Sequence, residues 1–64
     1  MNRLYAVIAE ERDENGNLLR SEEYERHDCS AATVAARVRA LNKMIYDDYR
    51  SKTHRFRYQR VSPA

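Results

Sequence analysis

Cysteine, glycine and proline each occur once in this 64-residue chain, and tryptophan does not occur at all. With Cys29 as the only cysteine, no disulfide can form within the chain. No apolar run approaches the ~18 residues that a membrane-spanning helix needs, and the N-terminus has no signal-peptide core. A lone thiol without a secretion signal predicts a cytoplasmic protein without a membrane partner.

The length of the chain allows one domain, which we expect to span residues 1–64. A chain of this size buries only about 60% of the surface that its unfolded form exposes, so its core is small. Neither a disulfide nor an evident metal cluster would support that core. We therefore expect help from self-association, as a homodimer, or from a protein partner.

Charge is distributed unevenly along the chain, although the formal net charge is only +2. Residues 1–27 hold four arginines against seven acidic residues, a net charge of −3. Residues 28–64 hold eight basic residues against three aspartates, a net charge of +5. This polarity favours charged partners, or head-to-tail contact between copies.

An amphipathic helix is predicted over residues 30–52. Its apolar residues recur at intervals of three or four and form one stripe of a helix, with Ser30 or Asp28 as the N-cap. The stripe consists of Val34, Val38, Leu41, Ile45 and Tyr49. Since the opposite side is small or charged, this helix is expected to cover a single surface.

Two strands are predicted before the helix, at about residues 3–11 and 18–27. The dipeptide Asn15-Gly16 between them is a strong hairpin signal and favours a type I′ turn, in which both residues have positive φ. The first strand is apolar, whereas the second is rich in glutamate and is expected to lie at a charge-protected sheet edge.

A two-residue turn would fix which residues of the hairpin face each other: Asp13 and Leu18, Ala9 and Glu22, Val7 and Tyr24, and Tyr5 and Arg26. One side of the hairpin then carries Tyr5, Val7, Ala9 and Tyr24, and the other carries Leu4, Ala6, Ile8 and Leu19. Neither side is polar, so the sequence leaves open which one the helix covers.

Residues 54–61 alternate between two sides, which is typical of a strand, and Phe56 and Tyr58 are expected to face the helix. The predicted fold is therefore α+β, with ββαβ order and a three-stranded, mainly antiparallel sheet. Because apolar strands tend to be central, we expect the order 2-1-3, with the helix on one face. The order 1-2-3 would instead place the acidic strand beside the basic one.

A helix on one face leaves the other face of the sheet uncovered, and a mixture of apolar residues and arginine there would form a contact surface. This predicts a non-enzymatic interaction protein that binds a protein partner. The expected partner-binding residues are Tyr5, Tyr24, Arg26, Arg55 and Arg57.

A nucleic-acid-binding module is the alternative hypothesis, because basic and aromatic residues interleave in the C-terminal segment. Arginine can pair with phosphates and aromatic rings can stack on bases. The possible phosphate contacts are Arg50, Lys52, Arg55, Arg57 and Arg60. The acidic first half of the chain counts against this hypothesis.

No catalytic, metal or cofactor motif emerges from the sequence, and we expect no enzymatic activity and no cofactor. His27-Asp28-Cys29 with His54 lacks the spacing of a metal site and is interpreted as a surface turn. A nucleophilic role of Cys29 is opposed by its neighbour Asp28. The glutamate pairs at residues 10–11 and 22–23 are interpreted as charge partners of Arg12 and Arg20 across the strands.

In its small size, single domain and lack of a catalytic signature, the chain resembles the accessory proteins of phages and prophages. Some of those proteins inhibit host defence systems. The resemblance implies a possible inhibitor that acts by protein–protein contact.

Overall fold

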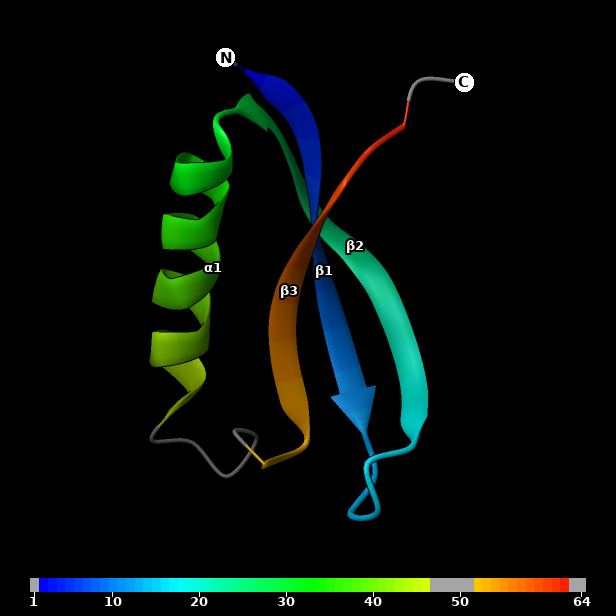
Figure 1. Ribbon diagram of the computed structural model, residues 1–64. Coiled ribbons are helices and arrows are strands. Elements are labelled where there is room, and N and C mark those ends of the chain that lie inside the picture. The colour runs from blue at the N-terminus through cyan, green and yellow to red at the C-terminus, as the bar shows by residue number, and fades with distance from the viewer. Residues whose placement is uncertain (1, 47–51, 63–64) are drawn as a thin grey trace.

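The computed structural model describes residues 2–46 and 52–62. The elements follow in the order β1 (Arg3–Arg12), β2 (Leu18–Cys29), α1 (Ala31–Tyr46) and β3 (His54–Arg60) (Figure 1). The sheet has the order β2-β1-β3, and β1 is antiparallel to both of its neighbours. The predicted α+β fold, strand order and placement of the helix on one side of the sheet are therefore confirmed.

The helix α1 begins at Ala31, one residue after the predicted start. Ser30 precedes the helix as its N-cap: its hydroxyl oxygen accepts a hydrogen bond from the Thr33 amide at 3.2 Å. Residues 47–51, which include the expected stripe residue Tyr49, lie outside the described residues. Lys52 lies in the connection to β3 rather than in α1.

The core lies between α1 and one side of the sheet. The helical stripe buries Val34, Val38 and Leu41 against Tyr5 and Val7 of β1. These side chains point to one another because the three-to-four spacing of α1 and the two-residue period of β1 each gather apolar residues on one side. Cys29 and Phe56 are partly buried at the margin of this cluster.

The hairpin turn differs from the predicted type I′ turn. Among the described residues only Gly16 has a positive φ, of 85°, so Asn15 does not adopt the left-handed conformation expected of it. The Asp13 amide donates to the Asn17 carbonyl at 2.9 Å, and the Gly16 amide donates to the Asp13 carbonyl at 3.0 Å. This is a three-residue loop that ends in a left-handed glycine, the commonest alternative to a two-residue turn.

The register between β1 and β2 also departs from the prediction, which is correct only in its middle. Ala9 faces Glu22 as expected, but an irregularity between Val7 and Ile8 shifts the pairing by one residue. The predicted partners Val7–Tyr24, Tyr5–Arg26 and Asp13–Leu18 are replaced by Val7–Glu25, Tyr5–His27 and Arg12–Leu18. A β-bulge at Tyr24 accounts for the first two changes, since two residues of β2 there oppose one of β1. A second irregularity, between Glu11 and Arg12, accounts for the pairing of Arg12 with Leu18.

Candidate functional site

The side of the sheet that faces away from α1 is called the open face below, because no other element packs on it in the part of the chain that the structure describes. It is built from alternate residues of the three strands. Its members are Leu4, Ala6, Ile8 and Glu10 of β1, Ser21, Glu23, Arg26 and Asp28 of β2, and Arg55, Arg57 and Gln59 of β3.

Two of the three apolar residues that β1 places on the open face are hidden, although no second layer covers them; the third, Leu4, is 38% exposed. Ala6 is 3% exposed and Ile8 is 8% exposed. Ile8 lies between Glu23 on one side and Arg57 on the other, and Ala6 lies between Arg26 and Gln59. Long polar side chains can cover apolar neighbours with their aliphatic stems. The open face is consequently more strongly charged than the sequence led us to expect, although Leu4 is exposed on it.

Ion pairs hold the arginines of the open face in place. The guanidinium of Arg57 donates to Glu10 at 3.0 Å and to the Gln59 side chain at 2.9 Å. Arg26 donates to both carboxylate oxygens of Glu23, at 2.5 and 3.2 Å. The hydrogen bond from Arg26 holds the pKa of Glu23 below its usual value. These contacts hold the planar guanidinium groups of Arg26 and Arg57 in place on the open face.

The five predicted partner-binding residues do not form one surface. Arg26, Arg55 and Arg57 share the open face. Tyr5 is only 9% exposed and belongs to the core beneath α1, with its ring edge-on to that of Tyr58 at 5.9 Å. Tyr24 is 53% exposed but lies on the helix side, where its ring contacts that of Phe56 at 4.9 Å.

The predicted phosphate contacts are also divided between surfaces. Arg55 and Arg57 lie on the open face, whereas Arg60 pairs with Tyr5 and lies on the helix side. Lys52 lines a small hollow beside the start of β3. Arg50 lies outside the described residues.

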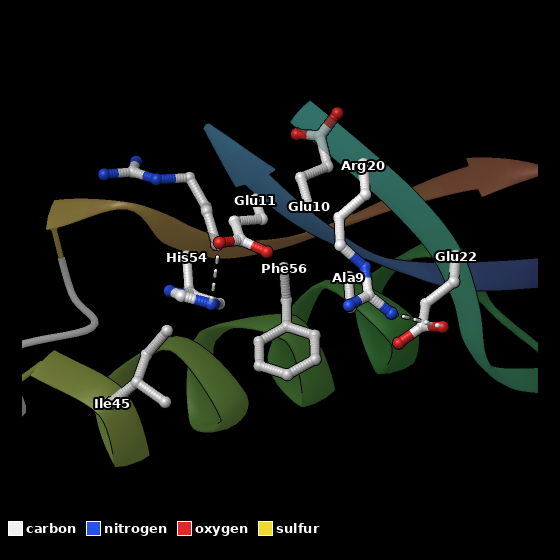
Figure 2. Close-up of a pocket in the computed structure, with 9 residues that line it drawn as sticks. Ala9, Glu10, Glu11, Arg20, Glu22, Ile45, His54 and Phe56 are labelled. Carbon is white, nitrogen blue, oxygen red and sulfur yellow. Dashed lines mark hydrogen bonds and ion pairs between the residues drawn. The ribbon is translucent and has the colours of Figure 1, made fainter. Parts of the chain in front are cut away.

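A hollow of about 230 Å³ opens on the helix side, between the end of α1 and β2 (Figure 2). Phe56 and Ala9 form its apolar part, and the His54 ring lies 3.9 Å from the Glu11 carboxylate at its edge. This volume is below the ~300 Å³ at which small-molecule pockets begin. The residues that line it are Ala9, Glu10, Glu11, Arg20, Glu22, Ile45, His54, Arg55 and Phe56.

A second hollow lies at the other end of α1 and is lined by His27, Asp28 and Cys29. These residues form the end of β2, which pairs with β1 up to Cys29, and not the predicted surface turn. The described residues include no group of three potential metal ligands. Instead, Glu25 accepts hydrogen bonds from Arg37 of α1, at 2.6 and 2.8 Å, and lies 3.2 Å from the His27 ring. The hydrogen bonds from Arg37 and the His27 contact lower the pKa of Glu25 to about 2. This ion pair joins the helix to β2.

Sequence reasoning missed two residues that shape this surface. Glu10 was considered only as a charge partner of Arg12 or Arg20; it lies 3.5 Å from Arg12, but it also binds Arg57 of β3, and its side chain is 11% exposed. Asn42 was not considered at all, yet it hydrogen-bonds the backbone of Phe56. The only sequence signal for Asn42 was its position, as a polar residue beside the apolar stripe of the helix.

None of the described helices is long and apolar enough to cross a bilayer. Comparison with known proteins gives no match: no family model fits the chain, and no curated protein or solved structure is significantly similar to it. The fold defines a small α+β protein with an open three-stranded sheet. Any function must therefore be argued from the surface itself.

Proposed function

We propose that this chain is a non-enzymatic interaction protein that binds a partner protein through the open face. The observation that carries the proposal is the set of arginines on one uncovered side of the sheet, two of which are fixed by carboxylates. Arginine is enriched in protein interfaces and often contributes a large share of the binding free energy. We assign the main contacts to Arg26, Arg55 and Arg57.

Preorganisation supports this assignment. An arginine that is already held by a neighbouring carboxylate loses less side-chain freedom when a partner binds. Arg57 and Arg26 lie on the two outer strands of the sheet, on either side of β1. A partner that spans the sheet would contact both of them. Carboxylates or backbone carbonyls on the partner would accept from the guanidinium groups.

The chemistry of the open face therefore suits a flat, acidic protein surface. Inhibition would follow if the partner's own functional surface were the one covered. This is the mode of action that the resemblance to phage accessory proteins implies, and it rests on size and composition alone.

A nucleic-acid-binding role remains the second proposal, and the exposed Arg55 on the open face supports it. The divided placement of the predicted phosphate contacts counts against it, because Arg60 lies on the other side of the sheet from Arg55 and Arg57. Binding to phosphates would weaken steeply with salt, by a slope set by the number of phosphates contacted.

The test compares two variants that lose the same charge. Arg26→Gln with Arg55→Gln removes two cations from the open face, whereas Arg39→Gln with Lys43→Gln removes two from exposed positions of α1. The partner is first identified by copurification from native cells, and its affinity is then measured for each variant. We expect the open-face variant to bind at least tenfold more weakly and the helix variant to bind normally.

The reverse order of affinities would overturn the proposal, and so would equal affinities. Titration of single- and double-stranded nucleic acid at several salt concentrations separates the second proposal from the first. If an oligonucleotide binds with a steep salt dependence and no protein copurifies, the nucleic-acid role is favoured.

A further inference from the structure

The two outer edges of the sheet are not equivalent. Beside β3, the Asn42 side chain donates to the Phe56 carbonyl at 3.1 Å and accepts from the Phe56 amide at 2.8 Å. The helix thus occupies this edge at Phe56, and α1 contacts β3 more than it contacts either other strand (Figure 1). The outer edge of β2 has no neighbouring strand in the part of the chain that the structure describes.

The pairing pattern shows which backbone groups of β2 face that edge. Phe56 directs its amide and carbonyl away from β1, so its partner Ala9 directs its own groups towards Glu22 on the other side. Backbone direction alternates along an antiparallel strand. Ser21 and Glu23, the neighbours of Glu22, therefore present their amides and carbonyls to the free edge.

We propose that a second copy of this chain pairs with β2 in antiparallel fashion, with the two-fold axis at Ser21. An axis at Glu22 would also allow hydrogen bonds between the copies, but it would place the two Glu22 carboxylates directly opposite each other, which is unfavourable. An axis at Glu23 would set two carboxylates directly opposite each other, which is unfavourable. An axis at Ser21 places a small residue against itself and pairs Leu19 with Glu23 of the second copy.

This register also makes the charges complementary. Arg20 of each copy faces Glu22 of the other, which gives two symmetric ion pairs on the helix side of the sheet. Within one copy these side chains are already close, at 3.3 Å, and both are mostly exposed. Pairing between copies therefore exchanges the two surface ion pairs within the copies for two ion pairs across the interface. The other β2 glutamates do not oppose association, because Arg26 and Arg37 of the same chain bind Glu23 and Glu25.

The exposed surface area of the chain also supports a dimer. The chain exposes 5048 Å², whereas a compact monomer of this mass exposes about 4300 Å². The excess, about 700 Å², is close to the ~800 Å² that each partner buries in a standard interface. The chain is also extended, with dimensions of 37 × 25 × 14 Å.

The dimer would form one six-stranded sheet, with β2 of each copy at its centre and α1 of each copy towards its ends. Residues of the same face meet across the axis, so the two open faces would lie side by side on one surface. This inference stands apart from the proposed function, since the β2 edge and the arginines of the open face are different groups. The proposed dimer can be disproved without affecting the proposed partner binding, and the reverse is also true.

The first test measures the mass of the protein in solution by sedimentation. It then changes the charges of Arg20 and Glu22, which pair between the copies. At micromolar concentration we expect twice the chain mass of 7.6 kDa. Arg20→Glu gives a chain with two carboxylates at the interface, and Glu22→Arg gives one with two guanidiniums. Each variant alone should dimerise at least tenfold more weakly, and an equimolar mixture should recover the dimer. A monomeric wild type overturns the proposal, as does a mixture no more dimeric than its components.

The second test fixes the register by cross-linking. In a Cys29→Ala background, Ser21→Cys places two thiols across the axis, where opposed Cα atoms are ~5.5 Å apart, within disulfide range. Glu23→Cys is the control, because two such residues would lie ~13 Å apart. Mild oxidation should link the Ser21→Cys chains and not the Glu23→Cys chains. Cross-linking of the control alone, or of neither variant, overturns the register.

Discussion

The side-chain amide of Asn42 bonds both the amide and the carbonyl of Phe56, so that α1 takes the place of a fourth strand beside β3. Each of the two hydrogen bonds satisfies a backbone group that would otherwise be left without a protein partner at this margin of the core. The pair therefore joins the helix to the sheet by more than apolar contact. It also explains why the two edges of the sheet differ.

We expect Asn42→Ala to lower the free energy of unfolding by about 1–2 kcal/mol, because two partly buried hydrogen bonds are lost. Urea denaturation followed by circular dichroism measures the loss. Arg39→Ala, at an exposed position of the same helix, is the control and should change stability by no more than about 0.5 kcal/mol. Equal stability of the two variants would show that Asn42 does not hold the edge of β3.

The ion pair between Glu25 and Arg37 predicts a specific pH dependence. The folded-state pKa of Glu25 is lowered to about 2, whereas the ordinary value is 4.5. A lowered pKa stabilises the fold above the unfolded value, and this contribution disappears as the pH falls from about 4.5 towards 2. At neutral pH, Glu25→Gln should therefore be less stable than wild type by about 1 kcal/mol.

The measurement compares the two proteins at pH 6 and at pH 3 by urea denaturation. Other carboxylates titrate in both proteins, so only the difference between them reports on Glu25. That difference should shrink at pH 3. A difference that stays constant between the two pH values would contradict the assignment.

Gly16 ends the hairpin loop with a φ of 85°, and no atom lies within 4 Å of where a Cβ would be. Gly16→Ala should therefore be destabilising through backbone strain alone, by about 1 kcal/mol. In a domain of this size, that loss lowers the melting temperature by about 4–8 °C. Gly16→Asn should cost less, since asparagine tolerates the left-handed region. Equal melting temperatures for the two variants would show that the turn changes its conformation.

Arg57 lies beside Ile8 and shields it on the open face. We expect Arg57→Ala to lower the free energy of unfolding by about 1 kcal/mol. If the aliphatic stem provides the shielding, Arg57→Met should lower it by less than half as much. The ion pair with Glu10 contributes less, because the Arg57 side chain is largely exposed. Urea denaturation decides the order, and equal losses in the two variants would assign the effect to the charge.

The sequence predicted the helix, the strands and their order because each follows from a strong period. The stripe of α1 and the apolar run of β1 leave few alternatives. The turn was predicted wrongly because Asn15-Gly16 fits two loop types. The Asp13 carboxylate, which accepts hydrogen bonds from the Asn15 and Asn17 amides at 2.9 Å, favours the longer one.

The candidate site was predicted less well because it depends on register. A bulge at Tyr24 moves every later partner of β1 by one residue, and no residue type marks its position in the sequence. The burial of Ala6 and Ile8 by neighbouring polar side chains follows from cross-strand pairing and not from composition. Arg55 and Arg57 share one side by alternation along β3, whereas Arg26 joins them only because the bulge moves its partner from Tyr5 to Ala6.

The central claim is that the open face is the surface a partner protein covers. A photoreactive benzophenone side chain at Gln59, which is exposed on the open face, tests it inside the cell. The same group at Ala36, exposed on α1, is the control. We predict a covalent adduct with a different protein from position 59 and none from position 36. An adduct from position 36 alone, or only an adduct of the chain with itself at position 59, would contradict the account.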